Sequence, residues 1–127
     1  FVDRMDATRM GLVRDAIALH RRGLAEQEML VPWWPTCLPG FTDDWLASGL
    51  RPAPGSELGH GYLTVWRRGG AATIDIPLDA GMRLEQVFPD PCHAPAALPW
   101  RLEPIDGGVR ITATDTDRPS ARIFRVL

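Results

Sequence analysis

The stretch Gly61-Tyr-Leu-Thr-Val-Trp-Arg-Arg-Gly-Gly-Ala-Ala-Thr-Ile-Asp-Ile-Pro-Leu78 decides the fold class of this sequence. Before its glycine pair, Leu63 and Val65 fall on one side of an extended chain. The other side carries Tyr62, Thr64 and Trp66. After the glycines the alternation resumes, with an apolar face made of Ala72, Ile74, Ile76 and Leu78. Two period-two runs divided by Gly69-Gly70 predict a β-hairpin, because a tight turn needs the positive φ that glycine adopts at low cost.

Five other segments have the alternation or the flanking turn residues of short strands. They are Trp45–Arg51, Met82–Phe88, Trp100–Ile105, Val109–Thr114 and Arg122–Leu127. Met82 and Leu84 are expected to point inward, and Asp106-Gly107-Gly108 is expected to form the turn of a second hairpin. About seven short strands separated by turns favour a mainly β fold: an antiparallel two-sheet β-sandwich preceded by one N-terminal α-helix.

The N-terminal region predicts that helix. Asp6 is a good N-cap and is followed by good helix formers. Apolar residues at helical spacing form a stripe made of Met10, Val13, Ile17 and Leu24, widened by Leu12, Ala16 and Leu19. This arc covers about half of the circumference, which is broader than the stripe of an ordinary surface helix. We therefore expect a helix that lies between two surfaces.

Residues 31–44 separate the helix from the predicted strands. Three prolines and a glycine exclude a helix there and predict an extended, turning path. The segment also carries Trp33, Trp34 and Phe41, whereas a flexible linker would be polar. We interpret it as a strap that lies across an apolar surface.

Composition limits the classes of function. The chain has 127 residues, enough for one domain with its own core, and a formal net charge of -2. That charge gives no electrostatic reason to expect nucleic acid or an anionic membrane as a partner, and no apolar run is long enough to span a membrane. All 14 basic residues are arginine, so a lysine Schiff base and a lysine-bearing phosphate loop are excluded.

Phe1-Val2-Asp3 indicates a piece of a longer protein, so the compartment stays unknown.

Residues 1–70 resemble the C-terminal end of glycoside hydrolase family 36, the bacterial α-galactosidases. Three stretches carry the resemblance. They are Asp3-Arg-Met-Asp with Leu12-Val-Arg-Asp-Ala-Ile-Ala-Leu-His-Arg21, then Val31-Pro-Trp-Trp-Pro35 with Leu38-Pro-Gly-Phe-Thr-Asp-Asp-Trp-Leu-Ala-Ser-Gly-Leu-Arg51, and Leu63-Thr-Val-Trp-Arg-Arg-Gly-Gly70. Beyond residue 70 the similarity is only a pattern of strands.

The resemblance implies an organisation and a parent activity. Residues 1–30 would be the terminal helix region of a catalytic (β/α)₈ barrel, residues 31–44 a Pro/Trp-rich strap, and residues 45–127 the C-terminal β-sandwich. The parent would hydrolyse terminal α-galactosides with retention, which requires two carboxyl groups roughly 5 Å apart. The family's nucleophile lies in a Lys-x-Asp motif, which this lysine-free sequence lacks. Thr114-Asp115-Thr116-Asp117 is only superficially similar to the acid/base motif and is better interpreted as a polar turn. This segment is thus expected to be non-catalytic, to need no cofactor and to brace the barrel of the same parent chain.

The tryptophans allow a second function. Flat indole surfaces can stack on sugar rings, so Trp33, Trp34, Trp45 and Trp66 are candidates for a carbohydrate-binding module that recognises galactose-containing oligosaccharides. Large aromatic residues also dominate cores and interfaces. The alternative role is a domain interface made of Leu12, Val13, Ala16, Ile17, Trp33, Trp34 and Phe41. Removed from its barrel, the same apolar helix face could drive self-association.

No other group of residues predicts a site. The histidines at positions 20, 60 and 93 are scattered, and His93 beside Cys92 offers only two potential metal ligands, so no metal site is expected. Cys37 and Cys92 lie outside any Cys-x-x-Cys motif, and free thiols are the default expectation. Asp43-Asp44 predicts a turn or a cap before Trp45, and Asp3 predicts a further capping carboxylate at the helix start.

Overall fold

The computed structural model describes residues 6–91 and 99–127, and within them the fold is mainly β. One α-helix, α1 (Ala7–Glu26), is followed by a 3₁₀ turn, η2 (Gln27–Met29). Eight strands follow: β1 (Leu30–Trp33), β2 (Trp45–Pro52), β3 (Gly61–Arg67), β4 (Thr73–Pro77), β5 (Leu84–Phe88), β6 (Arg101–Ile105), β7 (Gly108–Thr112) and β8 (Ser120–Val126). The predictions that involve Asp3, Cys92 and His93 lie outside the described residues.

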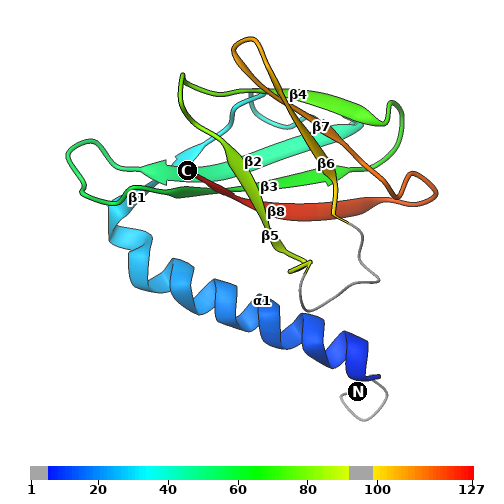
Figure 1. Cartoon of the computed structure of the whole chain (residues 1–127), viewed down its shortest axis with the longest axis horizontal. Coiled ribbons are helices and arrows are strands. Elements are labelled where there is room, and N and C mark those ends of the chain that lie inside the picture. Colours follow the sequence, from blue (N-terminus) through cyan, green and yellow to red (C-terminus); the bar gives the residue numbers. More distant parts are fainter. Residues whose placement is uncertain (1–5, 92–98) are drawn as a thin grey trace.

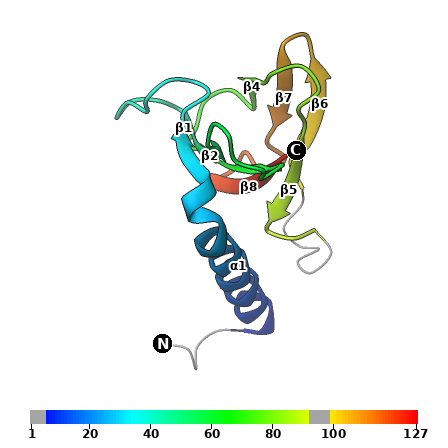
Figure 2. The same ribbon diagram turned by 90° about the vertical axis from the view of Figure 1, so that its left-hand side faces the viewer.

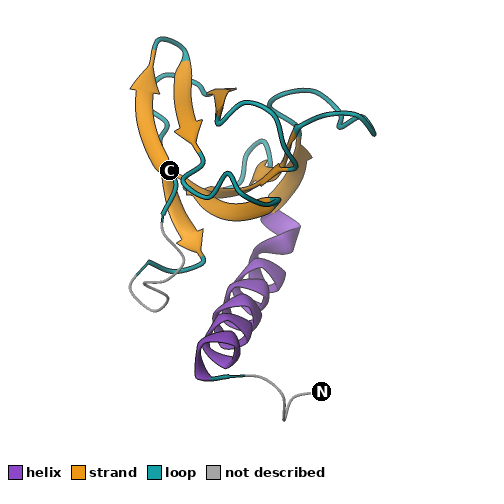
Figure 3. Ribbon diagram, turned by 90° about the vertical axis from the view of Figure 1, so that its right-hand side faces the viewer, coloured by secondary structure: helices purple, strands orange, loops and turns teal. Residues whose placement is uncertain are grey.

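The strands form two antiparallel sheets, as predicted. The larger sheet has the order β1-β2-β3-β8-β5 and the smaller sheet the order β4-β7-β6. The two sheets form two layers, and α1 extends from the larger sheet on the side away from the smaller one (Figures 1 and 3). The helix therefore contributes nothing to the space between the layers.

The core lies between the two layers. Its fully buried side chains come from both sheets, and the largest are Phe124, Leu63, Ile76, Ile111 and Val65. The two faces that the alternation separates in β3 and β4 are their inward and outward sides, because in a strand every second side chain faces the same way. Burial of each such side chain contributes on the order of 1.5–3 kcal/mol to the free energy of folding. The core between the sheets is therefore the stable part of the chain.

The predicted hairpin of Gly61–Leu78 is wrong. Its two strands exist, but β3 pairs with β2 and β8, whereas β4 pairs with β7 in the other sheet. The intervening residues cross between layers and are held by Arg67, a buried side chain that donates to the carbonyl oxygens of Gly70 at 2.6 Å and Ala71 at 3.0 Å. Trp45 Nε1 also donates to the oxygen of Ala71 at 3.0 Å. Gly70 does have the predicted positive φ, at 71°, but it serves this crossover.

The second hairpin is confirmed. β6 and β7 pair so that Ile105 lies opposite Gly108, which makes Asp106-Gly107 a two-residue turn with Gly107 at a φ of 80°. Gly108 belongs to β7 rather than to the turn.

Three other predictions need correction. Met82 does not point inward: β5 begins at Leu84, which is buried, while Met82 is 36% exposed. The segment Trp45–Arg51 is the second strand and not the first, because the start of the strap forms β1, which pairs along β2 from Leu30 opposite Pro52 to Trp33 opposite Gly49. The rest of the strap follows the expected apolar surface only in part: Trp34 and Pro39 line a hollow with Leu46 and Trp66, whereas Leu38 is 71% and Phe41 99% exposed.

Each of the four edge strands contains a proline or an irregular register. Pro32, Pro77 and Pro104 occupy β1, β4 and β6. β5 has an irregular register between Gln86 and Phe88. Proline lacks the N–H that a further strand would need, so these edges are poor partners for another strand.

Candidate functional site

The outer side of α1 is an exposed apolar stripe, defined here by Val13, Ile17 and Leu24. Asp6 caps the helix as predicted, accepting a hydrogen bond from the Arg9 backbone N–H at 2.8 Å. The three stripe side chains are 37%, 48% and 50% exposed. Leu19 is the only buried residue of the helix. Since successive residues turn by about 100°, Leu19 lies nearly opposite Ile17. The sheet therefore covers one side of α1, and the stripe faces away from it.

The inner side of α1 is attached to the sheet by a polar cluster, the Glu26 clasp, made of Glu26, His60, Tyr62 and Arg125. The Tyr62 hydroxyl donates to Glu26 Oε2 at 2.8 Å, and His60 Nε2 lies 2.9 Å from the same oxygen. Arg125 contacts the other ring nitrogen of His60 at 3.3 Å. These contacts join the end of the helix to β3 and β8 and fix the direction in which the helix leaves the sandwich.

The clasp shifts the ionisation of its members. Burial, the hydrogen bond to Glu26 and the charge of that carboxylate together raise the pKa of Tyr62 to about 12. Burial alone would raise the pKa of Glu26, but the hydrogen bonds from Tyr62 and His60 outweigh it and lower that pKa. Both shifts favour a neutral tyrosine that donates to a charged carboxylate. A polar cavity of about 260 Å³ adjoins the clasp.

The second apolar surface, the tryptophan hollow, lies on the outer face of the larger sheet. Trp34, Pro39, Leu46 and Trp66 line this hollow of about 330 Å³, together with Ser48 and Arg68. Trp34 is 43% and Trp66 39% exposed. Arg68 donates to the carbonyl oxygen of Phe41, which ties the projecting part of the strap to β3 near the hollow.

Trp45 has an internal role. It is half-buried, its ring meets that of Trp100 edge-on at 5.5 Å, and its indole N–H is used within the crossover. Trp100 in turn donates to Asp115 Oδ1 at 2.7 Å, and Arg122 bonds the other carboxylate oxygen at 3.1 Å. Although burial alone would raise the pKa of Asp115, the Trp100 hydrogen bond and the charge of Arg122 lower it. Asp115 is thus a structural carboxylate in the segment that was predicted to be a polar turn.

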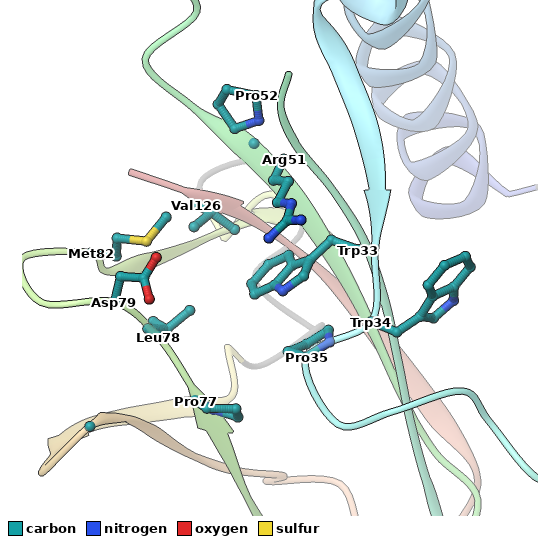
Figure 4. A pocket seen from close by; sticks show the side chains of 12 residues that line it. Trp33, Trp34, Pro35, Arg51, Pro52, Pro77, Leu78, Asp79, Met82 and Val126 are labelled. Carbon is teal, nitrogen blue, oxygen red and sulfur yellow. The ribbon is translucent and has the colours of Figure 1, made fainter. Parts of the chain in front are cut away.

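Trp33 lies at the margin of the core and faces a cavity of about 460 Å³ at one end of the sandwich. Figure 4 shows Trp33 pointing from β1 into this cavity while the neighbouring Trp34 points away. Arg51 enters from β2, and Asp79 and Met82 lie on the facing side. The two candidate tryptophans of the strap therefore differ in position: Trp33 lines the cavity alone, whereas Trp34 lines both the cavity and the hollow.

The remaining predicted residues fall into these regions. Leu12 is half-buried, Ala16 is exposed on α1, and Phe41 is almost completely exposed in the strap. Asp43 makes the expected turn by accepting from the Gly40 backbone N–H at 2.7 Å. Cys37 is free and exposed.

Over residues 6–91 and 99–127, no three potential metal ligands converge. No helix in the described part of the chain is long and apolar enough to cross a membrane.

Sequence reasoning missed the clasp and the charged groups of the cavity. His60 was treated as an isolated histidine, although its alternation with Tyr62 placed both on the same side of β3. Glu26 is 36 residues from Tyr62 in the chain, so no local pattern could pair them.

Comparison with known proteins gave no match: no protein-family model, curated protein or solved structure corresponds to this chain.

Proposed function

We propose that this chain is the non-catalytic C-terminal domain of an α-galactosidase-like retaining glycoside hydrolase, in which it braces the catalytic barrel. The observation that carries the proposal is the exposed apolar stripe of α1, on the side of the helix opposite its own sheet. A helix that is apolar on two sides is stable when both sides are covered. The resemblance of residues 1–70 to family 36 supplies the occupant, namely the barrel to which this helix would belong.

The arrangement of carboxylates supports a non-catalytic role. Retaining glycosidases place two carboxyl groups roughly 5 Å apart at the scissile bond. Among the described residues that line the Trp33 cavity, Asp79 is the only acid. The cavity at the clasp is lined by Glu26, Glu85 and Asp90, and Glu26 is engaged there by Tyr62 and His60. Asp115 is engaged by Trp100 and Arg122. The catalytic pair is then expected in the barrel, and this chain alone should not hydrolyse an aryl α-galactoside. Turnover by clean protein would refute this part of the proposal.

Binding to a barrel tests the bracing role directly. A family 36 catalytic barrel produced without its C-terminal domain should bind this chain, and its Tm should rise on mixing. Ile17→Glu places a charge in the stripe and should weaken binding by more than tenfold, since a desolvated charge at an apolar interface costs more than 1.4 kcal/mol. The matched control is Ala18→Glu, an exposed position turned by about 100° from Ile17. Equal binding by both variants, or none by the wild-type chain, would contradict the proposal.

The stripe also supports the prediction from the sequence that the isolated chain associates with itself. Without a barrel, two copies could cover each other's stripes. Sedimentation at increasing concentration should then show association that Ile17→Glu abolishes and Ala18→Glu preserves.

Carbohydrate binding by exposed tryptophans is the second candidate function. Trp34 and Trp66 are the pair that shares one face of the sheet. Apart from the indole N–H groups, the polar side chains of the hollow are Ser48 and Arg68, and Arg68 already donates to the carbonyl oxygen of Phe41, so the hollow has no carboxylate or uncommitted charge to bind sugar hydroxyls. This composition favours packing against protein in the hollow, so the hollow is assigned to the bracing surface.

A further inference from the structure

The cavity at Trp33 has a composition that bracing does not require. It lies at the open end of the sandwich, between β1 and β2 of the larger sheet and the segment that follows β4. Its volume of about 460 Å³ is within the range of roughly 300–1,000 Å³ typical of small-molecule sites. It shares Trp34 with the tryptophan hollow, but none of its lining residues belongs to α1, so its occupancy and barrel binding through the α1 stripe can be tested independently.

One wall of the cavity is a fixed aromatic surface. Trp33 is half-buried and packs against the core, which restrains its ring. Gly49, its partner across the strands, provides the space: a Cβ there would lie 2.9 Å from Trp33 Cε3 and 2.6 Å from the Tyr62 carbonyl oxygen. Leu78 and Met82 extend the apolar surface on the facing side. A ring held in this way can stack on a flat apolar surface at little entropic cost.

Two uncommitted charges complete the lining. Within residues 6–91 and 99–127, neither the Arg51 guanidinium nor the Asp79 carboxylate forms a hydrogen bond or ion pair. Arginine supplies five N–H donors, and an ionised carboxylate supplies acceptors only. A ligand that satisfies both must donate and accept, and the opposite charges give no preference for a net anion or cation.

We propose that this cavity is a saccharide-binding site in which Trp33 stacks on a pyranose ring and Arg51 and Asp79 bind its hydroxyl groups. A pyranose has C–H bonds on a flat face, which the negative face of an indole attracts, and its rim consists of hydroxyls that both donate and accept. An inorganic anion would meet the Asp79 carboxylate. A zwitterion would satisfy both charges but would leave the indole wall without a stacking partner.

The test is titration of this chain with raffinose, a galactose-containing trisaccharide, followed by calorimetry and by the NMR signals of the indole N–H groups. Binding should shift the Trp33 signal and leave that of Trp66 unchanged. Arg51→Gln and Asp79→Asn, both exposed positions that should not disturb folding, should each weaken binding about fivefold or more. Trp33→Ala should abolish it; if that variant is destabilised, the shift of the Trp33 indole signal in the wild-type chain is the independent readout. Trp66→Ala is the matched control and should bind normally.

Several outcomes would overturn the proposal. They are no heat and no shift at tens of millimolar sugar, undiminished binding by both charge variants, and loss of binding in Trp66→Ala. Glycine betaine or inorganic phosphate that binds as tightly as raffinose would equally reject a saccharide site. None of these results bears on barrel binding through the α1 stripe. The saccharide site can therefore be rejected without affecting the bracing proposal, which the barrel-binding experiment tests.

Discussion

The sandwich and the helix-strap region differ in how much of their apolar side-chain surface is buried within the chain. Between the sheets, Phe124, Leu63 and Val65 have no solvent exposure at all. In α1 only Leu19 is buried, and in the strap Phe41 is 99% exposed. Figure 2 shows the same contrast, with a closed pair of layers from which α1 and the strap project. The apolar residues of this sequence therefore fall into two sets: one closes a core within the chain, and the other stays exposed on α1 and the strap.

The largest test of this contrast compares two apolar truncations. Phe124→Ala should lower the free energy of unfolding by about 3–5 kcal/mol, because it leaves a cavity in a close-packed core. Ile17→Ala should change it by no more than about 0.5 kcal/mol, since that residue is 48% exposed and lies on the side of α1 that faces away from the sheet. Urea unfolding followed by tryptophan fluorescence measures both. Similar losses in the two variants would show that the helix is part of the same cooperative core.

An intermediate effect is expected at the crossover that closes the sandwich. Gly70 has a φ of 71°, and a Cβ there would overlap the Asp44 carboxylate, so Gly70→Ala should cost about 1–3 kcal/mol. The neighbouring Gly69 has ordinary φ and its added Cβ would lie 3.9 Å from the nearest atom, again of Asp44. Gly69→Ala should therefore cost only about 0.5 kcal/mol or less. The reverse order in thermal unfolding would argue against the crossover.

The smallest effect is expected where the two regions meet, at the Glu26 clasp. Because the folded-state pKa of Tyr62 is raised to about 12, its contribution to stability is complete below its ordinary value near 10. This contribution should be lost as the pH rises from about 10 to about 12, by on the order of 1 kcal/mol after allowance for solvent screening. Tyr62→Phe should lack this component of the pH dependence. If Tyr62→Phe and the wild type had the same stability curve in that pH window, the hydrogen bond from Tyr62 to Glu26 would not be holding the helix.

The sequence predicted best where the interactions are local. The turn at Asp106-Gly107 joins two strands that pair with each other, so composition alone located the β6–β7 hairpin. The inward faces of β3 and β4 also followed from alternation. The pairing of β3 did not, because its neighbours β2 and β8 include a strand more than 50 residues later in the chain.

Charged residues account for most of what the sequence could not predict. Arg67 follows the inward side set by Leu63 and Val65, yet its role depends on carbonyl groups that only the crossover brings near. The clasp and the Trp33 cavity likewise combine polar side chains from distant segments, namely Glu26 with Tyr62 and Arg51 with Asp79. Strand register and helix docking, which set those distances, depend on the whole fold.

The proline-bearing and irregular edges of both sheets decide how copies of this protein can meet. Open-ended fibrils grow when the outermost strand of one molecule templates a backbone ladder with the next. Pro32, Pro77 and Pro104 each remove a donor from such a ladder, and β5 departs from regular spacing at Gln86. Copies of the protein can then associate only through side-chain surfaces such as the α1 stripe. Once two copies cover these surfaces, no further copy can add, so high protein concentration should produce finite complexes rather than amyloid.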